Sequence, residues 1–271
     1  MATALLSELR DECELLLSVP SGDSYIDSTQ QLKDIQRAYE KTSGAYNWPQ
    51  LLVRVGLPIV ANVDRYALPT GFRKFHFLKV EDNLYSETEL EFLKKSRRKY
   101  AIDRNASQLI LSQVPTTAST TYTLSNAESA GSAVSIELDT VSGLSQFEEI
   151  FIDSASGTDE FTLVSSVGTL LITARLRAAK SASDVLYRQK AIIDMFYYRN
   201  PVALSGASDT MLIPDELDYT VCVYAAGLAF QRLEDYAKAD KLFATWEQQV
   251  RAAFLAQDAQ STDRVGEMTI G

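Results

Sequence analysis

Residues 125–187 read SNAESAGSAVSIELDTVSGLSQFEEIFIDSASGTDEFTLVSSVGTLLITARLRAAKSASDVLY, and this stretch decides how the chain is organised. It holds three Lys and Arg against nine Asp and Glu, and it is rich in Ser, Thr, Gly and Val. Alternating apolar segments recur in it between turn residues: AVSIEL, EIFIDS, EFTLVSSV, TLLITARL and DVLY. Short strands at regular intervals are typical of a small barrel or sandwich. The sequence therefore predicts an inserted all-β domain over residues 125–187.

Strand patterns continue on both sides of this insert. They occupy much of 47–80, then YAID at 100–103, QLILS at 108–112, TYTL at 121–124 and, after the insert, AIIDMFYYRN at 191–200. We expect the strand at 191–200 to pair with the strand that ends at Leu124, so that the insert interrupts a hairpin. Such an insertion is tolerated because loop-closure entropy rises slowly with loop length.

Apolar residues at helical spacing predict two helices before these strands and two after them. They cover 2–18, 28–44, 214–232 and about 234–257. The predicted class is α+β: a bundle of two N-terminal and two C-terminal helices, a β subdomain and the inserted barrel or sandwich. The core then comprises 1–124 with 188–257. Residues 258–271 are polar and show no period, which predicts a flexible C-terminal arm.

Composition excludes several classes of protein. The chain has one histidine, His76, and two cysteines, Cys13 and Cys222, so a His/Cys zinc site or a disulfide framework is not expected. Both cysteines fall in apolar helical patterns, and we expect them to be inert and buried. Charged residues interrupt the first apolar stretch, so we do not expect a signal peptide. The longest uncharged apolar run, 161–174, is too short to span a membrane, so we expect no membrane segment.

Enzyme chemistry is not expected either. A Ser-His-Asp hydrolase would have to use His76, and the sequence has neither a G-x-S-x-G elbow nor a glycine-rich phosphate loop. Glu148 and Glu149 are adjacent on a predicted strand and therefore point to opposite faces. We expect these carboxylates to be solvated rather than catalytic, and we expect no cofactor and no bound metal.

Charge is distributed unevenly. The formal net charge is −10, which argues against a protein that coats nucleic acid. A positive excess lies in the basic cluster, which we define as Lys94, Lys95, Arg97, Arg98 and Lys99. Three interpretations remain open for this cluster: a solvated face, a phosphate contact, or an electrostatic docking site for an acidic protein partner.

Two tryptophans are predicted core anchors where helices meet the β subdomain: Trp48 and Trp246. Residues 225–249, AAGLAFQRLEDYAKADKLFATWEQQ, have the small and aromatic residues of a tetratricopeptide-type helix pair. One copy cannot stack into a solenoid. We therefore interpret this segment as a helical hairpin that closes the bundle.

The order of these elements carries a family resemblance. The segments are AYNWPQLLVRVGLPIVANVDRYALPTGF (45–72), YAIDRNASQLILS (100–112), FYYRNPVAL (196–204) and IPDELDYTVCVYAAGLAFQRLEDYAKADKLFATWEQQV (213–250). In this order they resemble the head-tail adaptor (connector or head-completion) proteins of tailed bacteriophages. The insert at 125–187 departs from the short family pattern.

The resemblance implies a structural virion protein of the neck, assembled in the host bacterial cytoplasm. It implies a ring of about twelve copies beneath the portal protein, contacts to tail or nozzle proteins, and genome DNA that passes through the lumen without specific binding. The interface residues would be the basic cluster and four residues of the arm, Arg264, Val265, Met268 and Ile270. The basic cluster would face an acidic portal surface or a neighbouring copy, and acidic segments would face the channel.

Two other functions remain as alternatives. One is a non-viral protein-interaction module that uses the tetratricopeptide-like helix pair. The other is a carbohydrate-binding virion protein that acts through the β insert, which would require exposed aromatic residues or converging acids there. The aromatic residues of the insert are Phe147, Phe151, Phe161 and Tyr187.

Overall fold

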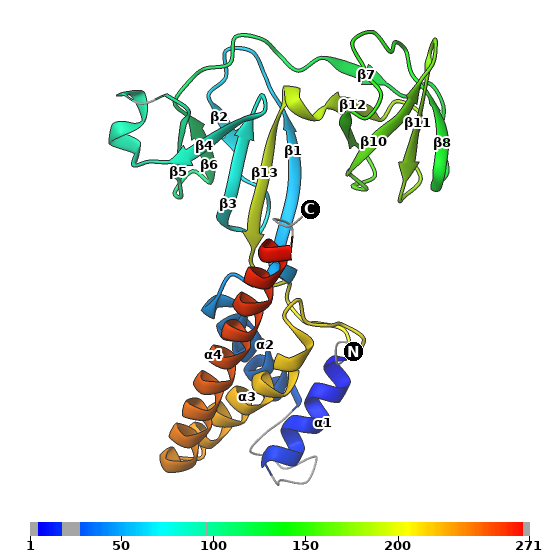
Figure 1. Cartoon of the computed structure of the whole chain (residues 1–271). Coiled ribbons are helices and arrows are strands. Elements are labelled where there is room, and N and C mark those ends of the chain that lie inside the picture. The colour runs from blue at the N-terminus through cyan, green and yellow to red at the C-terminus, as the bar shows by residue number, and fades with distance from the viewer. Residues whose placement is uncertain (1–4, 18–27, 96, 268–271) are drawn as a thin grey trace. The chain divides into compact units, whose positions relative to one another are not determined.

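The chain divides into two compact units. The computed structural model describes residues 5–17, 28–95 and 97–267, with side chains described as far as Asp258. The helical unit comprises Met1–Leu52 and Tyr198–Gly271, and the β unit comprises Val53–Tyr197 (Figure 1). The predicted α+β class is confirmed.

Helix α3 is the centre of the helical unit. The helices are α1 (Leu6–Leu17), α2 (Ser28–Ala45), α3 (Asp218–Arg232) and α4 (Tyr236–Glu267), with 3-10 turns η1 (Pro49–Leu51) and η4 (Asp215–Leu217). α3 packs against each of the other three helices. An added Cβ on Gly227 would lie 2.6 Å from Cε1 of Phe243, so the absence of a side chain lets α3 and α4 approach closely.

The core of this unit follows the predicted helical stripes. α1 contributes its apolar face, and α2, α3 and α4 contribute residues with the same spacing: Leu6, Leu9, Cys13, Ile35, Ala38, Tyr39, Val221, Cys222, Ala225 and Val250. The last helix was predicted to end near Gln257, but α4 continues to Glu267. Residues 258–265 contain neither Pro nor Gly, and most of them are compatible with a helix. The helix therefore continues through this segment although the segment has no amphipathic period.

The β unit begins with a seven-stranded sheet. Its strand order is β1 (Leu52–Pro58), β13 (Ile192–Arg199), β3 (Phe72–Val80), β4 (Asn83–Glu87), β5 (Lys99–Asp103), β6 (Gln108–Leu111) and β2 (Arg65–Ala67). The expected pairing of the strand at 191–200 with the strand ending at Leu124 is wrong, because β13 lies between β1 and β3. The 3-10 turn η3 (Gln189–Ala191) separates β13 from the strand before it.

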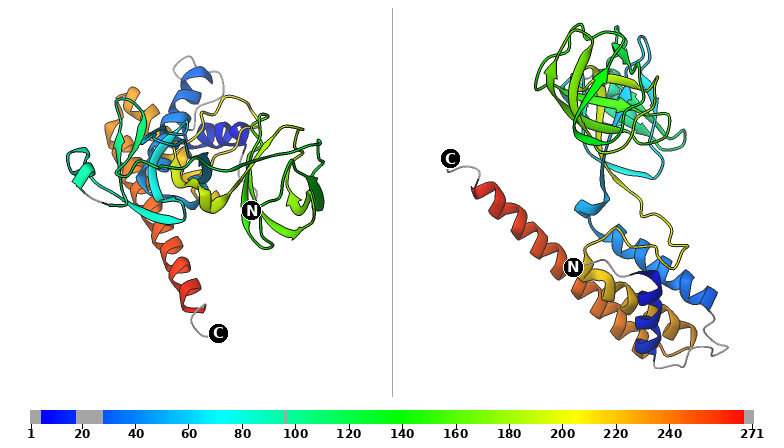
Figure 2. Two further views of the ribbon diagram at one scale, coloured as in Figure 1. Left: turned by 90° about the horizontal axis from the view of Figure 1, so that it is seen from above. Right: turned by 90° about the vertical axis from the view of Figure 1, so that its right-hand side faces the viewer.

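The second sheet has six strands and curls on itself. Its order is β7 (Thr121–Thr123), β12 (Val185–Arg188), β9 (Glu149–Asp153), β10 (Glu160–Val167), β11 (Leu171–Leu176) and β8 (Gly131–Glu137). The two end strands meet just beyond their ends, where Ser125 N donates to Glu137 O (2.9 Å) and Asp139 N donates to Thr123 O (3.0 Å). The curl is visible in Figure 2. Its interior is filled by inward-facing residues such as Tyr122, Ile136, Ile150, Ile152, Val164, Ile172 and Leu186.

Trp48 provides a test of the helical core. Its side chain is fully buried, and its Nε1 donates to Thr42 O (2.9 Å). We expect Trp48→Ala to destabilise the helical unit by about 3–5 kcal/mol, because a large cavity and an unpaired carbonyl remain. Urea unfolding followed by circular dichroism measures this. The control Leu15→Ala removes a side chain that is 72% exposed on α1 and should change stability by less than about 0.5 kcal/mol. Unchanged melting of Trp48→Ala would contradict a core role.

Candidate interaction surfaces

The basic cluster lies at the end of a short 3-10 helix in the β unit. This helix, η2 (Leu90–Lys95), is held on β5 and β6 by Leu93, which is buried with Ala101 and Ile110. Lys94, Lys95, Arg97 and Arg98 are exposed. None of Lys94, Lys95 and Arg97 has an ion-pair partner among the described residues. Their charges are therefore available to a partner molecule.

Two large apolar side chains stand beside these charges. Leu90 is 55% exposed and Phe92 is 51% exposed, both on η2. Exposed apolar side chains do not stabilise a basic surface that only contacts water. Protein interfaces, in contrast, commonly combine exposed apolar and charged side chains. We call the exposed group Leu90, Phe92, Lys94, Lys95, Arg97 and Arg98 the η2 surface.

A groove lies on the helical unit between α2 and α4. Its volume is about 590 Å³, and Tyr46, Trp246 and Val250 supply its apolar lining. Trp246 is half-buried and its Nε1 donates to Thr42 Oγ1 (2.9 Å). The ring of Tyr46 stacks on Phe254 with 4.1 Å between centroids. These contacts hold both aromatic rings in place, and we call this feature the Trp246 groove.

The Trp246 groove has an acidic rim. Two acidic residues, Glu40 and Glu247, flank the groove together with one basic residue, Lys41, and all three side chains are exposed. The groove also includes Gly44 and Ala45 at the C-terminal end of α2, whose last turn has no basic residue. A helix C-terminus carries a partial negative charge. The groove therefore suits a partner that presents basic and apolar groups together.

Arg54 joins the two sheets of the β unit. From β1 it donates to both oxygens of Glu149 on β9 (2.6 Å each) and to Asp194 on β13 (3.0 and 2.9 Å). Its guanidinium lies 3.6 Å from the centroid of the Phe161 ring. Burial alone would lower the pKa of Arg54, but the hydrogen bonds to Glu149 and Asp194 outweigh burial and raise it. This cation stays charged and fixes β9 against β1 and β13.

An apolar contact lies beside Arg54. An added Cβ on Gly56 would lie 2.8 Å from the side chains of Ile192 and Phe151, so only glycine permits this approach between the sheets. Phe151, Tyr187 and Ile192 form one buried cluster across the same junction.

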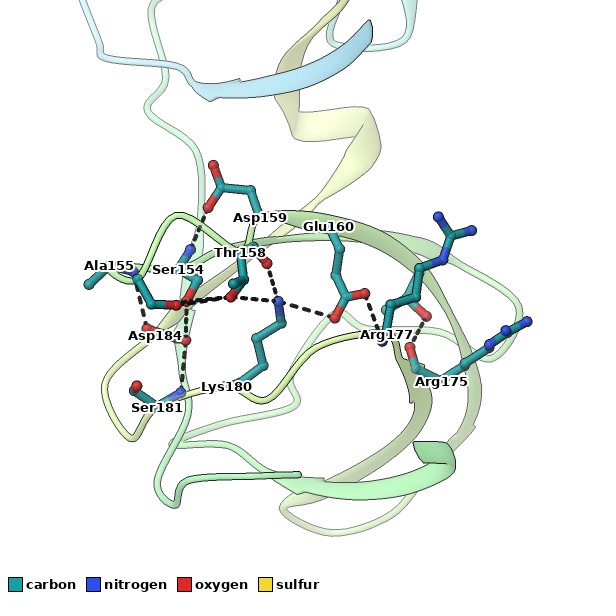
Figure 3. A network of polar contacts seen from close by, with 12 residues as sticks. Ser154, Ala155, Thr158, Asp159, Glu160, Arg175, Arg177, Lys180, Ser181 and Asp184 are labelled. Carbon is teal, nitrogen blue, oxygen red and sulfur yellow. Dashed lines mark hydrogen bonds and ion pairs between the residues drawn. The ribbon is translucent and has the colours of Figure 1, made fainter. Parts of the chain in front are cut away.

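A second polar network is buried inside the six-stranded sheet (Figure 3). Lys180 Nζ is buried, donates to Thr158 O and lies 3.1 Å from Glu160 Oε1. The other oxygen of Glu160 accepts from Arg177 N (3.0 Å). Figure 3 shows the side chains of Arg175 and Arg177 directed away from this network.

Asp184 organises the loop beside Lys180. It accepts hydrogen bonds from Ser154 Oγ (2.7 Å), Ala155 N (3.3 Å) and Ser181 N (2.9 Å). Burial, and then the nearby Asp159 and Asp184, raise the pKa of Asp153. These hydrogen bonds hold the loop in place beside a hollow of about 610 Å³, which Thr158, Asp159 and Glu160 help to line.

The histidine and the two cysteines belong to different units, with the two cysteines close together in the helical core. His76 is exposed on β3 beside Phe77, and Cys13 and Cys222 are buried free thiols. The hydrogen bond with Cys222 and burial raise the pKa of Cys13. Within the described ranges, no three His, Cys, Asp or Glu residues gather as metal ligands. No helix in that part of the chain is both long and apolar enough to cross a membrane.

The family model described as SU10 adaptor protein matches residues 3–269, nearly the whole chain. The chain belongs to the SU10 adaptor protein family. The resemblance to phage head-tail adaptors is thereby confirmed, and the protein is a structural adaptor of the phage virion. No curated protein matches the chain.

The residues predicted as sites in this adaptor lie in different places. The basic cluster is exposed except for Lys99, which is half-buried and donates to Ser86 Oγ (2.6 Å). Arg264 and Val265 lie on α4, beyond the described side chains, and Met268 and Ile270 lie outside the described residues. Trp48 is fully buried and Trp246 lines the groove.

The ion pairs of Glu148 and Glu149 were not predicted from the sequence. Glu148 and Glu149 were expected to be solvated, but Glu148 pairs with Arg188 (2.5 Å) and Glu149 with Arg54. The two residues have different partners, but Glu148 precedes β9, which begins at Glu149, so alternation along a strand does not explain the difference. The sequence carries no local signal for these pairs because Arg54 and Glu149 are separated by 95 positions.

Arg54 generates a prediction for the β unit. Arg54→Met keeps most of the packing but leaves Asp194, whose side chain is 1% exposed, without its cation. We expect a loss of about 2–4 kcal/mol and faster amide exchange in β9, measured by urea unfolding and hydrogen exchange. Arg104→Met, at an exposed turn, is the matched control and should be nearly neutral. Equal stability of the two variants would refute the role of Arg54.

Lys180 generates a second prediction. Lys180→Ala leaves Glu160 buried without a cation and should destabilise the β unit by roughly 3–5 kcal/mol in thermal or urea unfolding. Lys190→Ala is the control, because Lys190 is 52% exposed and its pair with Glu148 is worth about 0–1 kcal/mol. The double variant Lys180→Met, Glu160→Gln should recover most of the loss. A Lys180→Ala protein as stable as Lys190→Ala would show that the buried pair contributes nothing.

Proposed function

We propose that this adaptor forms the head-tail connector ring of a tailed phage, with about twelve copies beneath the portal protein. The ring joins the capsid vertex to tail or nozzle proteins in the neck of the virion and assembles in the host bacterial cytoplasm. The observation that carries the proposal is the family match over residues 3–269. The role is architectural, with neither substrate nor cofactor.

The parts of the chain divide this work. In the proposal, residues 1–124 and 188–257 form the adaptor core, with the four helices as its bundle. The insert at 125–187 faces outward or toward tail components, and the arm at 258–271 reaches the portal through Arg264, Val265, Met268 and Ile270. The length of α4, 32 residues, supports an arm that projects from the bundle.

Acidity supports passage of DNA. Each copy has a formal charge of −10, so a ring of twelve would carry roughly −120. DNA carries one charge about every 1.7 Å, and a lumen lined with carboxylates would repel rather than bind it. The genome would pass through such a lumen without specific contacts.

Mixing the full chain with purified portal rings of the same phage tests this function. We expect electron microscopy to show an added layer with one adaptor for each portal subunit. A variant that ends at Gln257 lacks the arm and should lose most of the layer at equal concentration. Portal rings that stay bare with saturating full-length chain would refute the proposed function.

A further inference from the structure

The charge of the chain is concentrated in one unit. The helical unit, residues 1–52 and 198–271, holds 10 Lys and Arg against 19 Asp and Glu, a formal charge of −9. The β unit, residues 53–197, holds 16 against 17, a formal charge of −1. The basic cluster therefore belongs to a nearly neutral unit, and the acidic surface belongs to the other. The β unit of one copy therefore adds little repulsion when it approaches the acidic helical unit of another, and its exposed cations can be attracted to carboxylates there.

The Trp246 groove and the η2 surface are complementary in chemistry. The groove combines an apolar lining of Tyr46, Trp246 and Val250 with a rim of two acidic residues and one basic residue: Glu40, Glu247 and Lys41. The η2 surface combines Leu90 and Phe92 with exposed lysines and arginines. At about 590 Å³ the groove lies within the range of about 300–1,000 Å³ found for ligand pockets, so it can receive an apolar side chain together with a basic one.

We propose that the η2 surface of one copy docks into the Trp246 groove of a second copy. The inference rests on the proposed function, because it names the contact that joins neighbours in the ring. Phe92 enters against Trp246 and Tyr46, while Lys94 and Arg97 approach Glu247 and Glu40. A cation placed beside both an aromatic face and a carboxylate is stabilised by a cation–π interaction and by a charged hydrogen bond.

A second copy fits the groove better than nucleic acid. Phosphate would be repelled by the carboxylates on the groove rim and by the C-terminal end of α2. Both complementary surfaces are present on every copy, so each subunit can donate η2 to one neighbour and receive η2 from another. Such a heterologous contact closes into a ring when the rotation between copies allows it.

Charge exchange in trans tests the contact. The η2 variant carries Lys94→Glu and Arg97→Glu, and the groove variant carries Glu40→Lys and Glu247→Lys. All four side chains are exposed, so both variants should fold, which circular dichroism checks. Each variant alone places like charges together at the contact and should self-associate at least about 10-fold more weakly than the natural chain in low-salt sedimentation.

Mixing the two variants should restore association to within about threefold of the natural chain, because an acidic η2 surface then meets a basic groove and the reverse. Arg104→Glu with Asp240→Lys is the control, since both residues are exposed outside the two surfaces. That control should associate like the natural chain. The inference would be overturned if the mixture did not restore association but a chain with all four changes did, because the contact would then lie within a single molecule.

The same chains on portal rings separate this inference from the proposed function. A layer built by the natural chain and by the mixture, but by neither variant alone, supports both. Equal layers from all chains would overturn the inference and leave the connector function intact. Absence of a layer with the natural chain would refute the connector function, and sedimentation would still decide the contact between copies. The contact would be overturned both in solution and on the portal if the natural chain remained monomeric in sedimentation and all variants built equal layers on portal rings.

Discussion

The pairing of β1 with β13 is the constraint on which the rest of the structure depends. The chain enters the β unit at β1 and leaves it at β13, so this pairing brings together the two halves of the discontinuous helical unit. Closing so long a segment is affordable because closure entropy grows only by about 0.6 kcal/mol for each doubling of length. α3 and α4 can then pack on α1 and α2 although nearly the whole β unit intervenes in sequence.

The same strand pair orients the six-stranded sheet. Arg54 stands on β1 and Asp194 on β13, and their ion pair extends to Glu149 on β9. Gly56 permits an apolar contact beside it. Partly buried ion pairs contribute little net stability, because desolvation offsets attraction, but they require one geometry. The apolar cluster therefore holds the two sheets together, while Arg54 selects one orientation between them.

The periodicity of apolar residues predicted most of the helices and strands, but it did not predict which strands or side chains far apart in the sequence would pair. The spacing of Leu6, Leu9 and Cys13 predicted the buried face of α1, and alternation predicted the strands of the insert. The partner of β13 could not be predicted, because strand pairing depends on which sheet edge is open. The Trp246 groove was missed for a related reason: Trp246 was interpreted as a core anchor, and its half-buried ring depends on α2, some 200 positions away.

Discontinuity in sequence also hides the electrostatic division of the molecule. Along the chain, residues 51–123 are positive and residues 124–187 are strongly negative, which suggests a basic subdomain beside an acidic insert. In the structure these two stretches share the β unit and nearly cancel, whereas the two acidic ends of the chain combine in the helical unit. Net charge alone would make copies of an acidic protein repel one another. The proposed contact uses this division, because the exposed cations of the η2 surface then meet carboxylates of the Trp246 groove while the remaining acidic surfaces of two copies repel one another.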